Sequence, residues 1–286
     1  MAEGSVGGRG SGVVSCLLAF ALVPLISQYH RPASVEEALE LLRSPRRVAL
    51  GGGTALNADR EPSDLEAVDL QALGLDEITV AESAGRVRVG ATATLDAMRR
   101  SELLPDSLRA LARAEQPSTL RTLATMGGLV AKGSSESLLL AAMLAHDAEV
   151  ELSGPGPDAS STPDAATADA PDADRASASS LAEVLGSGLP LAPGALITAV
   201  SVAAEGRTAS AGAGRTPADV PIVAVYGRRS TDGVSMALTG VAERPVLVDA
   251  GDPTAGLNPP GDFRGSRDYR LHLAATLAAR VNEELS

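Results

Sequence analysis

Short apolar runs of strand length alternate with stretches of helical period along the first half of the chain, and this alternation limits the possible folds most strongly. Ser34 and Glu37 are spaced as a capping box, in which the serine hydroxyl accepts from the Glu37 N–H and the glutamate reaches back. Apolar residues then recur at helical spacing until Pro45, and a short strand over 48–50 follows. Strands that alternate with helices indicate an α/β or α+β domain.

The same patterns predict the remaining elements. Strands are expected at 67–70, 78–80, 86–89, 148–152, 195–202, 220–225 and 234–238, and helices at 95–99, 107–114, 138–145 and 267–284. The later strands and the closing amphipathic helix predict a second, smaller unit of sheet plus helix.

Composition changes abruptly at residue 153. Residues 153–180 contain only Ser, Gly, Pro, Asp, Ala and Thr with one Arg. Such a segment buries too little apolar surface to offset the entropy lost on ordering. The sequence therefore predicts a disordered acidic insert over 153–180.

The N-terminal stretch gives a weak targeting signal. Residues 13–26 form an apolar run that is short for a membrane span but has the length of a signal-peptide core. Arg9 before it is offset by Glu3, and no small-residue cleavage site follows. We expect residues 1–22 to be a disordered extension or a mis-assigned start, and the protein to be cytoplasmic. A secreted or membrane-anchored binder of small ligands is an alternative that rests on this run alone.

Charge and composition argue against several classes of function. The net charge of −12 has the wrong sign for nucleic-acid binding, and an aromatic content of 2% leaves no stacking platform. The single cysteine, Cys16, excludes a disulfide framework and a cysteine-bound metal cluster. The three histidines, His30, His146 and His272, show no metal-ligand spacing. We expect no metal site and no nucleic-acid partner.

Two glycine-rich turns are the candidate binding features. Gly51–Gly53 directly follow the strand in VALGGGTAL, where bare backbone can approach a phosphate and the Thr54 hydroxyl can donate to it. Thr125–Gly128 form the second turn. Each is a weak signal alone, and a tight turn explains each equally well. Together, in an α/β setting, they suggest two backbone nests that hold one pyrophosphate.

The sequence offers no convincing nucleophile–base pair. Ser134 and Ser135 lie near His146 in the sequence, but no third group of a triad and no G-x-S-x-G nucleophile elbow accompany them. Their proximity to His146 is therefore better explained by chance than by a catalytic dyad. Asp147 and Glu149 are typical of the solvated ends of a helix and a strand. A chain with phosphate-binding turns and no general acid–base pair is typical of a protein whose bound cofactor carries out the chemistry.

At these residues the sequence resembles the FAD-binding medium subunits of molybdenum hydroxylases, the xanthine dehydrogenase and carbon monoxide dehydrogenase family. The resemblance runs from about Pro24 to the C-terminus. It is carried, in order, by YHRPASVEEALELL, VALGGGTAL, RVRVGATATLDAM, QPSTLRTLATMGGLVAKGSSESLLLAAMLAHDAEVEL, LAPGALITAV, RTPADVPIVAV and DFRGSRDYRLHLAATLAARV.

The resemblance implies a fold and a cofactor site. The implied fold is α+β, with a two-subdomain FAD-binding domain of the vanillyl-alcohol-oxidase-like type over 23–190 and a CO dehydrogenase flavoprotein C-terminal-like domain over 191–286. The implied FAD-binding positions are Gly51, Gly52, Gly53, Thr54, Ala55 and Leu56 on one side of the diphosphate, and Thr125, Gly127, Gly128 and Leu129 on the other. No residue is implied as catalytic.

By the same resemblance, the chain works with a 2Fe–2S small subunit and a molybdopterin-containing large subunit, and passes electrons to an acceptor such as NAD, oxygen or a quinone. The sequence departs from the family at Ala55, where the family has Asp, at Leu129 and Lys132, where it has Asn, and at Leu138, where it has an acidic residue. Either backbone amides hold the flavin, or the chain is a flavin-free structural and assembly subunit.

Overall fold

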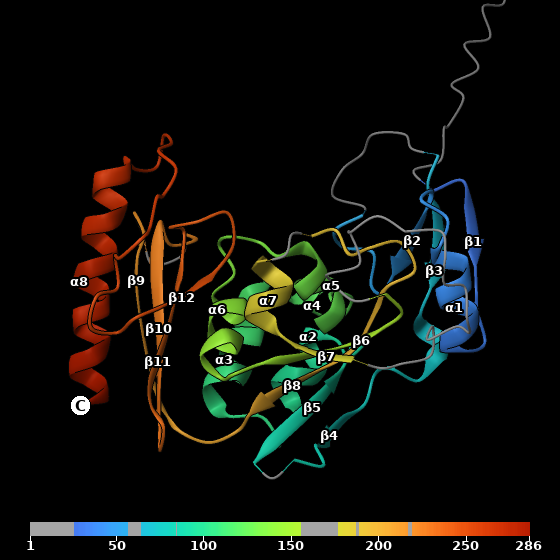
Figure 1. The fold of residues 1–286 in the computed structure, drawn as a ribbon, viewed down its shortest axis with the longest axis horizontal. Helices are drawn as coiled ribbons and strands as arrows, with labels where there is room; N and C mark the ends of the chain where they lie inside the picture. The colour runs from blue at the N-terminus through green and yellow to red at the C-terminus, as the bar shows by residue number, and fades with distance from the viewer. Residues whose placement is uncertain (1–25, 57–63, 84, 156–176, 187–188, 217–218) are drawn as a thin grey trace, which may run out of the picture.

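Three β-sheets follow one another along the chain in the computed structural model, which describes residues 26–56, 64–83, 85–155, 177–186, 189–216 and 219–286. Figure 1 shows the first sheet with its helix at the right, the second sheet and most helices in the centre, and the third sheet beside the last helix at the left. The predictions for residues 1–22 and for most of the acidic insert lie outside the described residues.

The first sheet is small and parallel. Its strands β1 (Gln28–His30), β2 (Arg47–Leu50) and β3 (Glu66–Asp69) lie in the order β1-β3-β2, and α1 (Val35–Leu42) covers it. The capping box is confirmed, because the Ser34 hydroxyl accepts from the Glu37 N–H at 3.2 Å. Glu37 reaches back to the N–H of Ala33 at 2.7 Å. A short 3₁₀ helix, Gln71–Leu73, leads to the second sheet.

The second sheet is antiparallel, with strand order β4-β5-β8-β6-β7. Its strands are β4 (Ile78–Val80), β5 (Arg86–Gly90), β6 (Glu149–Ser153), β7 (Ser177–Ser180) and β8 (Leu196–Ala203). The associated helices are α2 (Leu95–Arg100), α3 (Asp106–Glu115), α4 (Ser118–Arg121), α5 (Met126–Lys132), α6 (Leu138–Ala145) and α7 (Leu181–Gly186). The largest hydrophobic cluster lies between this sheet and these helices, with α6 buried over 139–145.

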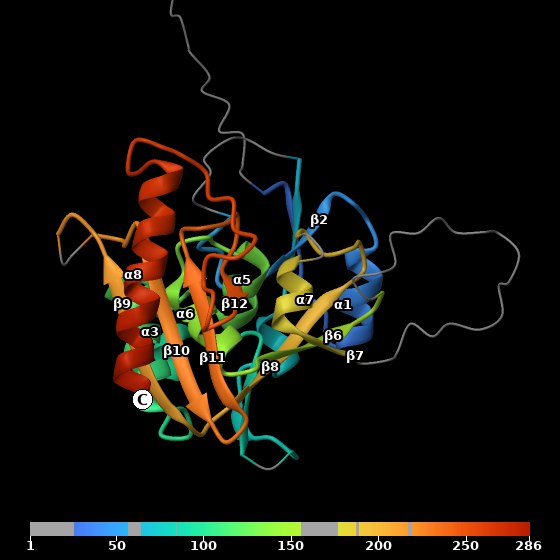
Figure 2. The same cartoon turned by 60° about the vertical axis from the view of Figure 1, so that its left-hand side comes forward.

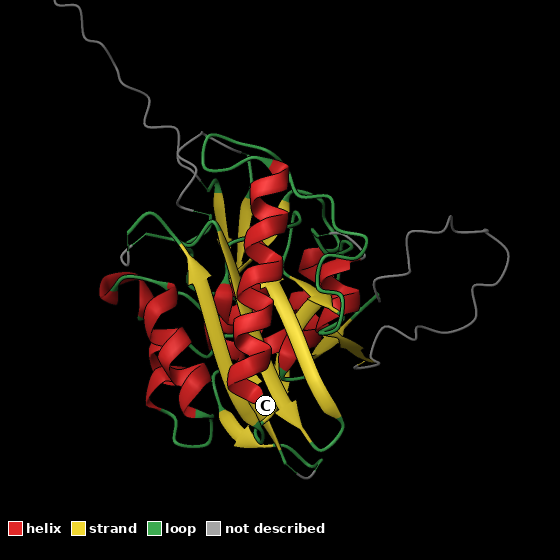
Figure 3. Cartoon of the chain, turned by 90° about the vertical axis from the view of Figure 1, so that its left-hand side faces the viewer, coloured by secondary structure: helices red, strands yellow, loops and turns green. Residues whose placement is uncertain are grey.

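The third sheet is antiparallel and is packed on both faces. Its strands β9 (Arg207–Ala213), β10 (Val223–Ser230), β11 (Gly233–Thr239) and β12 (Val246–Val248) lie in the order β12-β11-β10-β9. The long helix α8 (Arg267–Leu285) crosses one face, as Figure 3 shows, and α6 packs against the other. Because α6 also belongs to the core of the second sheet, this one helix joins the two parts.

The expected α+β fold with a C-terminal unit of sheet plus helix is confirmed. β8 lies in the middle of the second sheet, between β5 and β6, and Figure 2 shows it running beside β6, although the sequence-based boundary assigns it to the C-terminal domain. Its side chains are almost all buried, which suits a central strand. The C-terminal sheet itself begins only at β9.

The prediction of disorder over 153–180 is wrong at both ends. Ser153 is the last residue of β6, and Ser177–Ser180 form β7, an edge strand paired with β6. Backbone hydrogen bonds to a neighbouring strand hold this segment, so it needs no apolar side chains of its own. The residues between, 156–176, lie outside the described part of the chain. Among the described helices none is both long and apolar enough to cross a membrane.

Candidate functional site

The first glycine turn leaves β2 and runs against the segment that precedes the second turn. A Cβ atom on Gly52 would lie 1.5 Å from the carbonyl oxygen of Leu123, and one on Gly51 would lie 2.6 Å from Thr125 Oγ1. Gly53 has φ of +70°, in the left-handed region that glycine adopts without strain. These glycines are therefore required by close approach and backbone conformation, and the two turns are in contact.

The second turn is the N-terminus of α5, and its amides are used within the protein. Thr125 is the N-cap, and its hydroxyl accepts from the Gly128 N–H at 3.3 Å. The N–H of Met126 donates to Ala93 O at 2.9 Å, and that of Gly127 donates to Ala91 O at 2.8 Å. The first turn of this helix therefore has no spare donor for a ligand.

The amides of the first turn have no partner in the part of the chain that the structure describes. The N–H groups of Gly51, Gly52, Gly53 and Thr54 make no hydrogen bond to another described residue, and all four residues are half-exposed. Successive unpaired amides in a turn with one left-handed residue form a concavity that binds anions. The first turn is therefore the one that can bind a phosphate through its backbone.

A pocket of about 80 Å³ lies beside the two turns. Its walls combine residues of the first sheet with residues of α5 and the strand ends: Ala49, Gly51, Leu70, Ala91, Thr125, Gly127, Gly128, Ala131, Leu191, Ala195, Leu196 and Ile197. Small side chains and bare glycine backbone make up most of this wall, so a ligand can approach the main chain closely.

The pocket brings together Gly51, Thr125, Gly127 and Gly128 of the sequence-predicted positions. Gly52, Gly53 and Thr54 complete the first turn, with Ala55 and Leu56 directly after it. Leu129 is only 9% exposed and belongs to the hydrophobic core, so it does not line the pocket.

The other departures from the family also lie off the pocket wall. Lys132 is exposed at the end of α5, and Leu138 packs against the main core. The alanines and leucines of the wall were missed by sequence reasoning. The only sequence feature that these residues share is a small or apolar side chain next to a turn. This feature is too common in proteins to identify a binding site.

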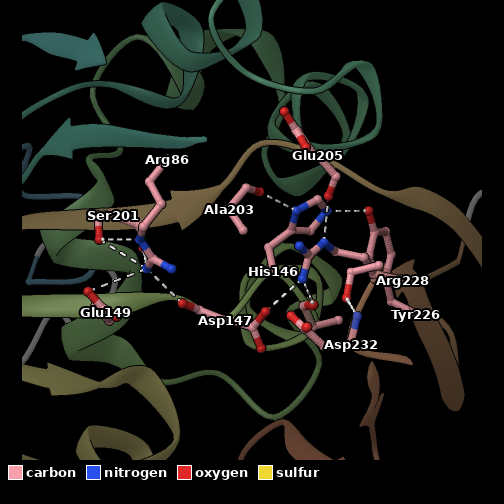
Figure 4. A network of polar contacts seen from close by, with 12 residues as sticks. Arg86, His146, Asp147, Glu149, Ser201, Ala203, Glu205, Tyr226, Arg228 and Asp232 are labelled. Carbon is pink, nitrogen blue, oxygen red and sulfur yellow. Dashed lines mark hydrogen bonds and ion pairs between the residues drawn. The ribbon is translucent and has the colours of Figure 1, made fainter. Parts of the chain in front are cut away.

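His146 lies away from this pocket, in a polar network at the C-terminal end of α6 (Figure 4). The imidazole is fully buried, with Nδ1 2.7 Å from Ala203 O and Nε2 3.0 Å from the Tyr226 hydroxyl. A carbonyl oxygen only accepts, so Nδ1 carries the proton and Tyr226 donates to Nε2. Tyr226 then accepts from Ser107, whose Oγ is 2.9 Å away. Desolvation on burial lowers the pKa of His146 to about 4.

Arg228 continues this network from β10 to the end of α6. Arg228 is 6% exposed, and its guanidinium donates to Asp147 Oδ2 at 2.7 Å and to the carbonyls of Glu205 and Ala145 at 2.7 and 3.3 Å. Arg86 donates to Asp147 O at 2.8 Å from the other side. His146 and Asp147 therefore join the second and third sheets, and neither ring nitrogen of His146 contacts Ser134 or Ser135.

Comparisons with known proteins agree with this geometry. The sequence profile of a family described as the FAD binding domain in molybdopterin dehydrogenase matches residues 25–202. The uncharacterized protein YgfM of Escherichia coli K12 is 37% identical over 129 residues, which is 44% of this chain and 49% of that protein. The match thus spans about half the length of this curated relative.

Solved structures share the fold over almost the whole chain. Quinoline 2-oxidoreductase from Pseudomonas putida 86 matches with a TM-score of 0.73 and 22% identity, over 92% of this chain and 97% of that one. Reconstituted CO dehydrogenase from Oligotropha carboxidovorans matches with a TM-score of 0.71 and 23% identity, over 90% and 96%. At these identities the likeness shows the fold alone.

Proposed function

The chain belongs to the family of FAD-binding domains in molybdopterin dehydrogenases, and we propose that it acts as the electron-transfer subunit of a molybdenum hydroxylase. Family membership rests on residues 25–202, which include both glycine turns. FAD is the cofactor of this family. The chemistry that FAD supplies when bound is the acceptance and release of electrons.

The residues beside the two turns fit the diphosphate of this cofactor. Four half-exposed amides, from Gly51 to Thr54, have no partner among the described residues, and a diphosphate offers acceptors for them. Gly127 and Gly128 leave bare backbone on the opposite wall. In this proposal the first turn donates hydrogen bonds, and the second supplies close packing around the bound group.

The partners follow from the chemistry that the chain lacks. One cysteine in the sequence is too few to ligate an iron–sulfur cluster, so the proposal places the clusters on a separate 2Fe–2S small subunit. A molybdopterin-containing large subunit would oxidise the substrate. The electrons would leave to an acceptor such as NAD or a quinone. The proposal places this complex in the cytoplasm.

The observation that carries the proposal is the row of amides from Gly51 to Thr54, which find no acceptor in the described part of the chain and lie beside a pocket walled mostly by small residues. Ala131→Leu tests it, because Ala131 is an exposed residue of α5 on the pocket wall and leucine is a good helix former. A leucine side chain would fill much of the pocket. We expect the dissociation constant for FAD, measured by fluorescence titration, to rise about tenfold or more with an unchanged melting temperature.

Ala110→Leu is the matched control, since Ala110 is an exposed alanine of α3 that does not line the pocket. It should leave FAD affinity unchanged. Equal affinities for wild type and Ala131→Leu would place the cofactor elsewhere. A wild-type protein that binds no FAD, with or without the partner subunits, would leave the flavin-free structural role as the function.

A further inference from the structure

The segment that leads from α3 to the second glycine turn presents its side chains to solvent. Its one-turn helix α4 has no buried residue, and Leu120 and Leu123 are 39% and 50% exposed. The Leu123 N–H donates to Leu120 O at 3.0 Å, so the two leucines belong to one turn of the chain. They form a small apolar patch on the surface.

The backbone under this patch is fixed and borders the proposed cofactor site. Arg121 Nη1 donates to the carbonyls of Arg113 and Gln116 at the end of α3, at 2.6 and 3.2 Å. The carbonyl oxygen of Leu123 lies 1.5 Å from the position that a Cβ on Gly52 would take. The patch therefore adjoins the first glycine turn directly.

Three arginines surround one carboxylate next to the leucines. Asp96, in the first turn of α2, is 8% exposed, accepts from Arg99 Nε at 2.9 Å and pairs with Arg100. The pKa of Asp96 is lowered chiefly by the hydrogen bond from Arg99, and the charges of Arg100 and Arg121 lower it further. Because Arg121 belongs to α4, these charges adjoin the apolar patch. Three guanidinium groups and one carboxylate make this part of the surface positive.

The other charges between α2 and α4 leave this positive excess in place. Asp106 is paired with Arg109 at 2.9 Å, and Glu115 hydrogen-bonds to the start of α6. Glu102 and Arg113 are both exposed and carry opposite charges. The local charge therefore differs in sign from the net charge of −12 of the whole chain.

We propose that Leu120, Leu123 and the three arginines around Asp96 form the docking surface for the 2Fe–2S subunit. This inference rests on the proposed function. Electron tunnelling slows steeply with distance, so the subunit that reduces the flavin has to dock beside the cofactor site, where this surface lies. The molybdopterin-containing subunit passes its electrons to the clusters and needs no contact here. The contact face of the 2Fe–2S subunit would combine apolar side chains with carboxylates.

The same local charges disfavour a second copy of this chain. In a two-fold contact a surface meets itself, so the arginines of one copy would face those of the other. A carboxylate-bearing face is attracted instead, and this attraction is screened by salt. Binding of the 2Fe–2S subunit should therefore weaken as the salt concentration rises.

Leu120→Ser tests the apolar part of the surface. The chain with FAD bound would be titrated with the separately purified 2Fe–2S subunit by calorimetry. We expect the dissociation constant to rise roughly fivefold, because a partly exposed leucine loses its burial against the partner. Leu247→Ser on β12 is the matched control, since Leu247 is 41% exposed, and it should leave the dissociation constant unchanged.

Arg100→Gln tests the charged part. We expect the dissociation constant for the 2Fe–2S subunit to rise roughly threefold at low salt and less at high salt. Arg46→Gln is the matched control, because the side chains of Arg46 and Arg100 are both 68% exposed. Each variant leaves its carboxylate another arginine, Arg47 for Glu66 and Arg99 for Asp96. FAD affinity and melting temperature should stay near those of wild type in Leu120→Ser and Arg100→Gln.

Three outcomes would overturn the docking surface while leaving the proposed function intact. Leu120→Ser and Arg100→Gln could bind the 2Fe–2S subunit as tightly as wild type. They could weaken binding of the molybdopterin-containing subunit alone, or dissociate a wild-type dimer of this chain, and either result would name a different occupant. A wild type that binds FAD but joins neither subunit would refute both proposals.

Discussion

The three sheets meet at two interfaces, and these differ in how their polar groups are satisfied. The interface between the first and second sheets, here called the open seam, holds a pocket, small side chains and four amides with no partner among the described residues. The interface between the second and third sheets, the closed seam, is filled by His146, Tyr226 and Arg228, whose polar atoms bond to carbonyls, hydroxyls and a carboxylate. Unpaired donors cost stability unless water or a ligand satisfies them, so the open seam is suited to binding and the closed seam to holding domains together.

The largest expected effect lies at the closed seam and depends on pH. The pKa of His146 is about 4 in the folded protein and near 6.5 when unfolded. Between these values the unfolded chain binds the proton more strongly, so stability is full above about pH 6.5 and falls as the pH drops towards 4. The loss attributable to His146 should reach about 3 kcal/mol.

Urea unfolding from pH 7 to pH 4 measures this loss, with His146→Gln as the comparison. The variant is less stable at pH 7 but should show a shallower fall, because it lacks the buried imidazole that takes up a proton on unfolding. If the free energies of unfolding of the two proteins fell in parallel with pH, water would reach His146 in the folded protein and the imidazole would be protonated there.

Arg228→Ala should have the next largest effect on stability. It leaves the carbonyls of Glu205 and Ala145 without their donor and removes the pairing of Asp147. Because the Asp147 side chain is 61% exposed and can be solvated, we expect a loss of about 2 kcal/mol in the free energy of unfolding. Arg229→Ala, at the exposed neighbouring position, is the control and should change little.

FAD affinity should stay the same in Arg228→Ala if the seams are independent. A weaker FAD affinity in this variant would contradict the independence of the two interfaces, because it would show that the closed seam positions the residues of the open seam.

Gly128→Val has the smallest expected effect on stability and acts on the open seam. A Cβ there has one protein neighbour within 4 Å, Thr125 Oγ1 at 3.1 Å, and valine is no worse in a helix than glycine. The side chain would enter the pocket, so FAD affinity should fall about tenfold, which is about 1.4 kcal/mol of binding free energy. Calorimetry and fluorescence titration check both results.

Gly186→Val on α7 is the control for this substitution, since open space surrounds the Cβ position there. Unchanged FAD affinity in Gly128→Val would remove the second turn from the cofactor site and leave only the first.

Much of the local structure was predictable from neighbouring residues. The helix over 138–145 is confirmed at both ends, because Ser137 caps a continuous apolar run and His146 ends it. The helix over 267–284 differs from α8 by one residue. Signals in these segments are local: a cap hydroxyl, a period and a terminating residue within a few positions.

Segments that depend on a distant partner were missed or misplaced. β7 has a serine- and alanine-rich sequence with no strand signal, and β6 makes it a strand by pairing with it. The sequence of β8 indicates a buried strand but not which sheet it joins. Likewise, the two glycine turns look alike in sequence, while only the first keeps amides that have no partner among the described residues.

The short elements, the two glycine turns and, through the order of the motifs, the family and its cofactor could all be predicted from the sequence alone. Three contacts became visible only once the chain was folded: Leu129 faces the core, Gly52 lies against Leu123, and His146 bonds to Tyr226, 80 residues away. Caps and periods depend on residues a few positions apart, so the sequence displays them directly. A pocket or a buried hydrogen bond depends on which distant segments pack together, because that packing alone determines which polar groups lose water and which find a partner.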